Sequence, residues 1–476
     1  MLIVKKFGGT SVGDKDRIVN VAKRCIEDYQ KGNDVVVVLS AMGKMTDELI
    51  AKAKEINPNP SRREMDMLLT TGEQTSVSLM AMAMDALGVP AVSLNAFQVA
   101  MHTTSVYSNA RIKRIDTDRI FNELEQRKIV IVTGFQGVDR FDNYTTLGRG
   151  GSDTTAVALA AALHADACEI YTDVDGVYTA DPRKVPEAKK LTEITYDEML
   201  EMATLGAGVL HNRSVELAKK HDVQLVVRSS MTLEEGTVVK ENVRKRTSEI
   251  SGVAGDDDAA RIAVLGVEDI PGVAFKIFNV LAKKNINVDM ILQSIGRGNR
   301  KDISFTVKEG DMEAAVTALE DHLPDGTYEA INSSAEMAKV SIVGVGLRNH
   351  YGMAARMFQA LYEADINIRM ISTSEIRVTV LVNKEDMEKA MILTDTRLQI
   401  NPKHYANSDV NKLNLHYNRL VKANNRLIDE VYEKELLRTK AEIEALQAQV
   451  NPHFIINALE SMYWVLVQKG DMETSK

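Results

Sequence analysis

Short apolar runs alternate with amphipathic stretches along the first 240 residues. Six runs predict β-strands: Leu2–Phe7, Val35–Leu39, Val89–Leu94, Ile129–Val132, Glu169–Thr172 and Leu225–Val227. Several of these runs lack polar alternation, which is typical of parallel strands buried on both faces. The stretches between them repeat apolar residues at helical spacing, as do Ile18, Val21, Ala22 and Cys25. The pattern predicts an α/β domain over residues 1–240, with a mostly parallel open sheet sandwiched by helices.

The pattern changes over residues 260–390, where the sequence repeats itself. Residues 271–291 align without gaps with residues 351–371, at an offset of 80 positions. Each copy has a predicted first strand, a loop, an amphipathic helix and two further strands. The first strands are expected at Ile262–Val267 and Val340–Val345. This order predicts two small ferredoxin-like β-α-β-β-α-β units, over residues 250–325 and 335–391.

The last part of the chain has a third pattern. Of the 28 glycines, only Gly470 lies after Gly352. Residues 411–450 contain neither Gly nor Pro, and two series of residues recur every seven positions: Leu413, Leu420 and Leu427, and Tyr417, Asn424 and Val431. This spacing predicts a long helical coiled coil with a polar Asn in its seam.

Composition narrows the class of protein. The chain has 476 residues, enough for roughly three domains at about 150 residues each. Its net charge of -9 weighs against a nucleic-acid partner. The only two cysteines, Cys25 and Cys168, exclude a disulfide framework and a Cys-rich zinc site. No apolar run approaches the roughly 18 residues of a membrane span, and the N-terminus lacks a signal-peptide pattern. These features predict a cytoplasmic protein without a membrane partner.

A Gly-Gly turn follows the first predicted strand. Gly8 and Gly9 come directly after Lys6 and Phe7, and a helix is predicted to follow. Glycines allow backbone N–H groups to approach a phosphate, and a helix N-terminus favours anions. The GxxxxGK[ST] spacing of a Walker A motif is absent. A purely structural strand-to-helix turn is the alternative interpretation.

Polar groups also follow the other predicted strands. Ser40, Gly134, Thr172 and Asp173 each stand at a strand's carboxyl end. In open α/β sheets, ligands bind outside this edge. We therefore expect these groups and Lys6 to converge on one cleft, although each alone is also compatible with ordinary turn chemistry.

Residues 145–159, TTLGRGGSDTTAVAL, begin as a loop and end as an Ala-rich helix. Ser152 or Asp153 is suited to cap that helix. Arg149 has the planar fork that binds a carboxylate or phosphate. An Asp at a helix cap is usually structural. Beside two glycines and Arg149, Asp153 is also a candidate for organising a charged transition state.

Six motifs in order carry a family resemblance: KFGGTSV (6–12), SAMGKMTD (40–47), MLLTTGEQ (67–74), TLGRGGSD (146–153), YTDVDGVYTADPR (171–183) and TYDEML (195–200). From residue 1 to about 390 the chain resembles the aspartokinases of the amino-acid-kinase family. The resemblance implies transfer of the ATP γ-phosphoryl group to the side-chain carboxylate of L-aspartate, giving 4-phospho-L-aspartate. This is the first step of lysine, threonine and methionine biosynthesis. ATP and Mg²⁺ bound through the nucleotide are the implied cofactors.

The resemblance also implies roles for individual residues. Lys6 would stabilise the transferring phosphoryl group, and Asp153 would orient the groups around it. Three groups of residues would bind ligands: Gly8, Gly9 and Ser40 the phosphate oxygens, Thr46, Glu73, Arg149 and Ser152 the aspartate, and Thr172, Asp173, Tyr178 and Arg183 the nucleotide. Glu73 would bind the substrate ammonium and Arg149 its α-carboxylate. One departure is Gly208, where many relatives carry a lysine. His211 is expected to be structural.

The repeated units resemble the tandem ACT domains of aspartokinases. By this resemblance, four residues of the first unit would hold a feedback amino acid, lysine and/or threonine: Gly272, Asn287, Val288 and Asp289. Asp289 would pair with the ammonium group. Turn and strand-end roles are the alternative for Asn287 and Asp289. In the second unit, Tyr351 and Arg369 depart from the pattern, so this unit is expected to act in dimerisation. A homodimer or larger homo-oligomer is implied.

Residues 392–476 resemble a different family, the sensor histidine kinases. The motif NPHF makes His453 the possible phosphoacceptor, but that family's ATP-binding half and membrane spans are missing. The sequence leaves open whether the junction is natural, engineered or artefactual. The junction is expected to truncate the last helix of the second ACT unit. Two alternative functions remain at this stage: another amino-acid kinase, such as a glutamate kinase, and a dimeric phosphorelay module that uses His453.

Overall fold

The computed structural model describes residues 1–206, 209–243, 249–294, 299–324, 326–348, 350 and 352–398. Its first compact unit spans Met1–Ile400. The predicted coiled coil and His453 lie outside the described residues, and so does Gly208. None of the described helices is both long and apolar enough to cross a bilayer.

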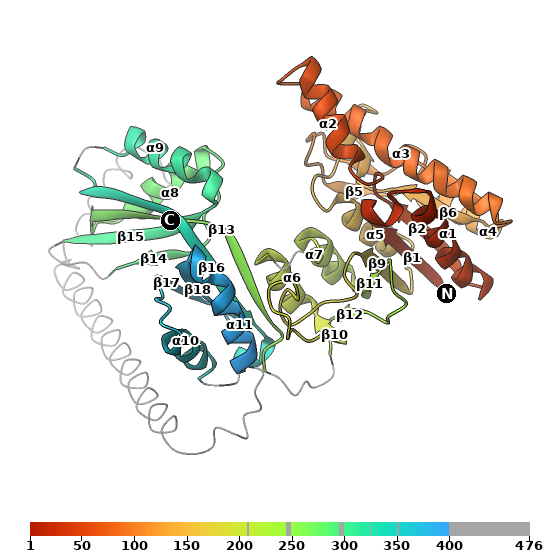
Figure 1. The fold of residues 1–476 in the computed structure, drawn as a ribbon. Coiled ribbons are helices and arrows are strands. Elements are labelled where there is room, and N and C mark those ends of the chain that lie inside the picture. Colours follow the sequence, from red (N-terminus) through yellow and green to blue (C-terminus); the bar gives the residue numbers. More distant parts are fainter. Residues whose placement is uncertain are drawn as a thin grey trace, which may run out of the picture. The chain divides into compact units, whose positions relative to one another are not determined.

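An eight-stranded sheet forms the centre of the N-terminal part (Figure 1). Its strands, in spatial order, are β10 (Glu193–Thr195), β12 (Thr237–Lys240), β11 (Leu225–Ser229), β9 (Ala167–Thr172), β1 (Leu2–Phe7), β2 (Asp34–Leu39), β6 (Ile129–Thr133) and β3 (Ala91–Leu94). All neighbours are parallel except β11 and β12. The predicted fold class is confirmed, and each of the six predicted strands coincides with a strand of this sheet.

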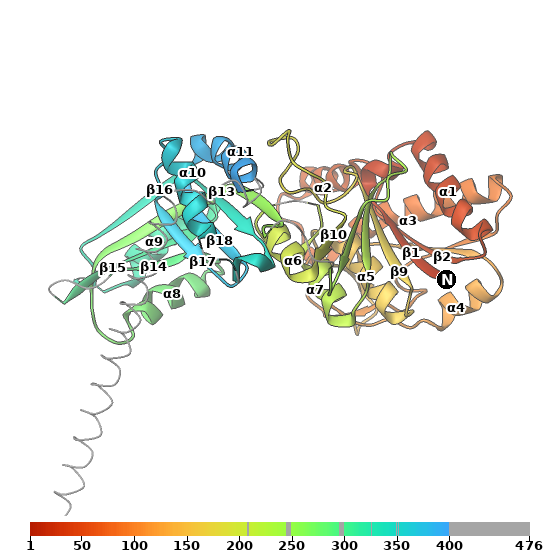
Figure 2. The same ribbon diagram turned by 90° about the horizontal axis from the view of Figure 1, so that it is seen from below.

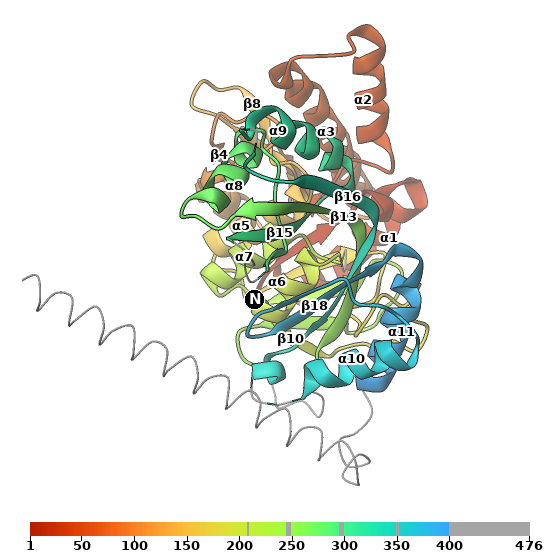
Figure 3. The same ribbon diagram turned by 90° about the vertical axis from the view of Figure 1, so that its left-hand side faces the viewer.

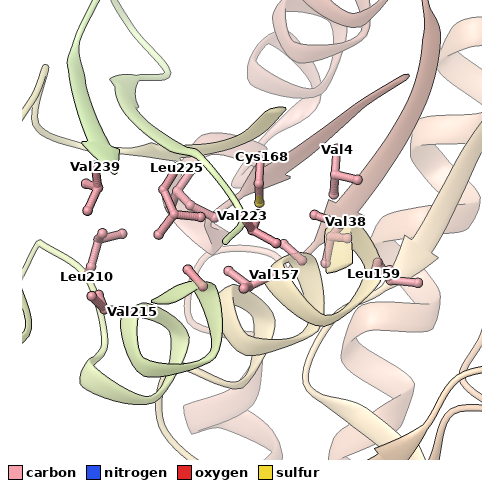
Figure 4. Close-up of a cluster of buried hydrophobic side chains, with 14 of the residues drawn as sticks. Val4, Val38, Val157, Leu159, Cys168, Leu210, Val215, Val223, Leu225 and Val239 are labelled. Atoms are coloured by element: carbon pink, nitrogen blue, oxygen red, sulfur yellow. The ribbon is translucent and has the colours of Figure 1, made fainter. Parts of the chain in front are cut away.

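Helices cover both faces of the sheet, and alternation along each strand assigns its residues to a face. In β2, Val35 and Val37 pack with one set of helices, and Val36 and Val38 pack with the other. The first set is α1 (Lys15–Gln30) and α3 (Arg62–Ala86); the second is α4 (Asp118–Glu125), α5 (Gly151–Ala162), α6 (Tyr196–Thr204) and α7 (Asn212–His221). Figure 4 shows the second face, where Val157 of α5 lies beneath the strand residues.

Smaller elements complete this part. Helix α2 (Met45–Ile56) precedes α3 and contacts it. A four-stranded sheet consists of β5 (Ile112–Arg114), β4 (His102–Thr103), β7 (Gln136–Val138) and β8 (Tyr144–Thr146). Strand β8 leads directly into the glycine-rich loop before α5, so this small sheet fixes where the loop begins.

The two repeats form one continuous six-stranded sheet. In spatial order it contains β14 (Ile291–Gln293), β15 (Arg300–Val307), β13 (Gly252–Glu268), β16 (Ala330–Val343), β18 (Arg377–Asn383) and β17 (Met370–Thr373). Strands β13 and β16 are much longer than the sequence pattern predicted. They pair from Gly252 with Val343 to Leu265 with Ala330, and so they run through both units.

Two hydrophobic cores lie on this sheet. In the first core, Ile262 and Ile331 pack with α8 (Val273–Lys283) and α9 (Met312–His322). In the second core, Val253 and Val340 pack with α10 (Met353–Glu363) and α11 (Met387–Leu398). Figures 2 and 3 show two separate pairs of helices on this sheet, α8 with α9 and α10 with α11. The first half of β13 thus belongs to the second core, and the two units interlock instead of following one another.

Helix α11 is not truncated, contrary to the expectation from the sequence. It spans Met387–Leu398, which is 12 residues, and its counterpart α9 has 11. Thr394 and Leu398 are buried, and Leu398 is part of the second core. The residues after 391 therefore continue the second unit as far as the described structure extends.

Candidate active site

Adjacent lysines of β1 point to opposite faces of the sheet. Lys6 points toward α5, where its Nζ lies 2.6 Å from Asp153 Oδ1. The two side chains are only 12% and 13% exposed. Asp153 lies in the first turn of α5, where the helix dipole favours a negative charge. The two predicted catalytic residues therefore form a shielded ion pair at the carboxyl edge of the sheet.

Lys5, on the other face, was not anticipated from the sequence. Its side chain is 1% exposed and forms ion pairs with Asp28 and with Glu169, whose Oε2 lies at 3.0 Å. Burial alone would lower the pKa of Lys5, but the neighbouring carboxylates outweigh it and the pKa is raised. Lys5 therefore stays charged and joins β1 to α1 and β9 directly behind Lys6. The signal was the second lysine in an otherwise apolar strand.

The Gly-Gly turn lies against the loop after β2. A Cβ on Gly9 would be 2.5 Å from the Ala41 carbonyl oxygen, so no side chain fits there. Gly43 N donates a hydrogen bond to Gly9 O at 3.0 Å. This close contact explains the glycine at position 9 and leaves the turn directly beside Lys6.

Ser40 and Ser152 connect the loop after β2 to α5. Their hydroxyl oxygens lie 2.9 Å apart. A Cβ on Gly134 would lie 2.5 Å from Ser152 Oγ, so this glycine permits the approach. Two of the strand ends that were expected to converge, those of β2 and β6, thus meet at Ser152, the neighbour of Asp153.

Glu73 is a buried carboxylate on α3. It is 3% exposed, and its Oε1 accepts a hydrogen bond from Ala41 N at 3.2 Å. Its Oε2 is buried and has no hydrogen-bond partner among the described residues. Burial raises the pKa of Glu73 to about 7. An under-satisfied carboxylate of this kind would gain from a cation placed against it.

Asp66 is a positioning residue that the sequence analysis missed. Its buried carboxylate accepts four hydrogen bonds, from the backbone N–H and hydroxyl groups of Ser108 and Thr146, at 2.8 to 3.1 Å. Thr146 ends β8, so Asp66 fixes the start of the glycine-rich loop. Asp66, Thr70 and Glu73 are buried at i, i+4 and i+7 on α3, and this polar stripe was the available signal.

Arg149 lies at the tip of the glycine-rich loop. It stands between Gly148 and Gly150, whose φ angles are 78° and 68°. Its side chain is exposed and forms no ion pair or hydrogen bond with another described residue, so its guanidinium is available to a ligand. Thr46, in the first turn of α2, is half-buried.

His211 packs against the glycine-rich loop and caps α7. A Cβ on Gly150 would collide with its imidazole ring. Its Nδ1 accepts a hydrogen bond from Arg213 N at 3.4 Å, which caps α7. The Arg213 side chain donates to Leu147 O at 3.1 Å. The loop is therefore held from α7 as well as from Asp66.

The predicted nucleotide residues follow β9, the strand beside β1. Thr172 donates a hydrogen bond from its Oγ1 to Asp173 Oδ1 at 2.9 Å. Asp173, Tyr178 and Arg183 line a single pocket. Arg183 also pairs with Asp181 at 2.9 Å. Because β9 and β1 are parallel neighbours, Asp173 emerges at the same edge of the sheet as Lys6.

The opposite wall of this pocket was not predicted. It comes from β13 and α11, through Val253, Gly255 and Met391. Val253 N donates to Thr179 O at 2.6 Å, so the six-stranded sheet contacts the backbone of the predicted nucleotide loop directly. Among the described residues, no group of three or more His, Cys, Asp or Glu side chains could hold a metal ion.

The predicted regulatory residues lie around α8. Gly272 precedes the helix with a φ of 89°, Asn287 is exposed, and Val288 packs on the first core. Asp289 Oδ2 lies 2.8 Å from Lys339 Nζ of β16. The carboxylate expected to bind a ligand ammonium therefore already pairs with an internal one.

The fold and the site define the class. The chain matches the family model described as "Amino acid kinase family" over residues 1–229, and an ACT domain model over residues 262–323 and 340–395. Residues 441–476, outside the described structure, match a histidine kinase model. The N-terminal part is thus an amino acid kinase, and the interlocked units that follow are ACT domains.

Similar proteins of known identity show which kind of amino acid kinase this chain is. An aspartokinase from Bacillus sp. (strain MGA3) is 51% identical over 391 residues, which cover 82% of this chain and 95% of the relative. Two structures of E. coli aspartokinase III are 27% identical and align with 84% of this chain. The complex with aspartate and ADP (R-state) has a TM-score of 0.71 over 100% of its chain, and the complex with lysine and aspartate (T-state) has 0.66 over 99%. The chain belongs to the aspartokinases.

Proposed function

We propose that this aspartate kinase divides phosphoryl transfer among three groups of residues around the Lys6–Asp153 pair. The enzyme transfers a phosphoryl group from a nucleotide to aspartate. In the proposed reaction, the aspartate side-chain carboxylate attacks the γ-phosphorus of ATP, the bond to the β,γ-bridging oxygen breaks, and 4-phospho-L-aspartate and ADP form. The observation that carries the assignment is the shielded ion pair, 2.6 Å across, beside the Gly-Gly turn.

The chain's main contribution is electrostatic. An aspartate side chain is ionised at pH 7, so the acceptor needs no general base. Phosphoryl transfer depends mainly on positioning and on stabilising the charge of the transferring group. Lys6 supplies a positive charge, and Asp153 holds its Nζ in place. Gly8, Gly9 and Ser40 offer hydrogen-bond donors to the phosphate oxygens.

Glu73, Arg149, Ser152 and Thr46 bind aspartate in this proposal. Glu73 receives the ammonium group, which would satisfy its unpartnered Oε2. Arg149 clamps the α-carboxylate with its free guanidinium. The complex of the E. coli relative with aspartate and ADP supports an aspartate site and a nucleotide site in one chain.

ATP binds along Thr172, Asp173, Tyr178 and Arg183. Mg²⁺ usually binds through substrate phosphates and one or two carboxylates. This mode fits a chain whose described residues offer no dedicated cluster of metal ligands. The ion would neutralise phosphate charge, and Asp173, which follows β9 in the pocket of the predicted nucleotide residues, would supply a carboxylate ligand.

Feedback inhibition by lysine, threonine or both acts through the ACT domains in this proposal. The lysine-bound E. coli relative supports lysine as an effector. Gly272, Asn287, Val288 and Asp289 would form the effector site, and the effector's ammonium would have to replace Lys339 at Asp289. The enzyme would act as a homodimer or larger homo-oligomer in the cytoplasm.

Aspartyl-hydroxamate formation tests the catalytic assignment. We expect Lys6→Ala and Asp153→Ala to lose at least about 100-fold in kcat, because each removes a charge that acts on the transition state. Lys23→Ala and Asp16→Ala, at exposed positions on α1, are matched controls and should retain activity. Glutamate assayed in parallel should react poorly. Normal activity of either site variant, with an unchanged circular-dichroism spectrum, would overturn its role.

A further inference from the structure

The sequence repeat creates two equivalent junctions between the ACT units. In the first, Asp289, which follows α8, pairs with Lys339 of β16. The offset of 80 between the copies makes Arg369 the counterpart of Asp289. The first strands align Ile262 with Val340, at an offset of 78, because the second copy has two more residues between this strand and the helix. Arg261 is therefore the counterpart of Lys339. A pair of opposite charges at one junction thus corresponds to two arginines at the other.

The structure brings these two arginines to one pocket. Arg261, Ser334, Arg369 and Lys384 line it, together with the carboxylates Glu336 and Glu385. In β13, the neighbours of Arg261 face the α8–α9 core, so alternation directs the Arg261 side chain to the opposite face. The pocket lies within the ACT sheet and shares no lining residue with the pocket beside the nucleotide loop.

The positively charged side chains of this pocket have only some of their possible hydrogen-bond and ion-pair partners among the described residues. Arg261 Nε is buried and has no hydrogen-bond partner among the described residues. Arg369 Nε donates to the neutral Asn383 Oδ1 at 3.3 Å. Lys384 is engaged by Glu309 at 2.7 Å. Glu336 and Glu385 are exposed, and within the described structure neither forms an ion pair with the arginines.

Two guanidinium groups that share a pocket repel each other unless an anion lies between them. A planar guanidinium binds carboxylate and phosphate groups through paired hydrogen bonds, and a buried N–H without a partner gains most from such a bond. We propose that this pocket is a second regulatory-domain site, which binds a small oxyanion through Arg261 and Arg369. Its ligand carries a carboxylate or phosphate group, whereas the effector site proposed at Asp289 would take an ammonium group.

Isothermal titration of the full chain with inorganic phosphate, and separately with succinate, tests the site at constant ionic strength. We expect saturable binding that weakens at least about tenfold in Arg261→Gln and in Arg369→Gln. Because the active site also attracts anions, Arg149→Gln serves as a reference and should retain this binding. Arg62→Gln, at an exposed position on α3, is the matched control. The phosphate and succinate arms distinguish the two ligand groups.

Kinase activity measured without added phosphate or succinate should be unchanged in Arg261→Gln, which shows that the variant is folded. Identical titrations of the wild type and both pocket variants would overturn the proposal. A pocket filled by acidic side chains of a second copy would overturn it too. In that case no anion would bind at the pocket, and Arg261→Gln would shift the oligomeric state in sedimentation.

Discussion

At the scale of single residues, charge and burial separate neighbours that look alike in sequence. Lys5 and Lys6 are adjacent, yet Lys5 joins three secondary-structure elements and Lys6 meets the predicted catalytic Asp153. The alternation of β1 alone produces this division. The same logic applies on α3, where Asp66 holds a loop and Glu73, two turns later, keeps one oxygen unpartnered.

Glu73 makes aspartate binding depend on pH. Its pKa of about 7, raised by burial, leaves the carboxyl protonated below that value in the free enzyme. A protonated carboxyl cannot pair with an ammonium, so kcat/KM for aspartate should fall up to about tenfold per pH unit below pH 7. Glu73→Gln should flatten the profile and raise KM. Initial-rate kinetics from pH 5.5 to 8.5 check this.

The same pKa has a consequence for stability, with the opposite sign. The folded pKa lies above the unfolded value of 4.5, so the unfolded state loses its proton first and the fold is penalised as pH rises from 4.5 to 7. Glu73→Gln should therefore stabilise the ligand-free enzyme at pH 8 by roughly 1–3 kcal/mol. Urea unfolding at pH 5 and pH 8 measures it. A variant destabilised equally at both pH values would contradict the assignment.

At the scale of elements, α6 connects the kinase domain to the ACT sheet. Glu198 is buried, caps its own helix through Thr195, and accepts hydrogen bonds from Ser251 Oγ and from Val345 N, the latter at 3.1 Å. One turn later, Glu201 pairs with Arg377 at 3.2 Å. Helix α6 is thus tied to the end of the β13–β16 pair where Gly252 meets Val343, and through Arg377 to β18.

Glu198→Gln should loosen this connection. The amide group would present a donor where the carboxylate accepts, which costs on the order of 1–3 kcal/mol when buried. Urea unfolding should show that loss, and inhibition by lysine should weaken while the KM for aspartate stays constant. Glu187→Gln, at an exposed position, is the matched control. Unchanged stability together with unchanged inhibition would remove α6 as the link.

The local sequence pattern predicted the strands and helices well, but it predicted less well which of them pair or pack together. The six parallel strands could be read from apolar runs because burial on both faces leaves a continuous local signature. The sequence could not show that β13 is shared between two cores. Val253 and Ile262 are equally apolar, and only the pairing of β13 with β16 shows which core each residue joins. Asp66 illustrates the same limit within the site. Its four partners lie 42 and 80 positions away, and no spacing rule connects them.

At the scale of the whole molecule, the ACT domains are coupled to themselves and to the kinase domain. Lys339 pairs with both Asp256 and Asp289, which joins the two ACT units at the predicted effector site. Lys339→Met should free Asp289 for an effector ammonium. We expect inhibition by lysine or threonine at concentrations several-fold lower, measured by hydroxamate assay. Asp289→Asn should abolish that inhibition, and an unaltered response in both variants would place the effector elsewhere.

Helix α11, the last helix of the described residues, completes the second hydrophobic core and contacts the kinase domain. Its Leu398 is buried in the second core, and its Met391 lines the pocket beside the predicted nucleotide loop. A chain ending at residue 398 keeps these contacts, and one ending at residue 391 loses the buried Thr394 and Leu398. We expect the first to match the full chain in activity and urea midpoint.

The shorter chain should be destabilised by several kcal/mol, since loss of one buried leucine side chain alone costs about 2–4 kcal/mol. Leu398→Ala in the full chain isolates that contribution, and Ile392→Ala, a partly exposed position on the same helix, is its matched control. Equal stability of the two truncated chains would mean that the second core closes without the end of α11. A loss of nucleotide affinity confined to the shorter chain would instead show that α11 supports the kinase site through Met391.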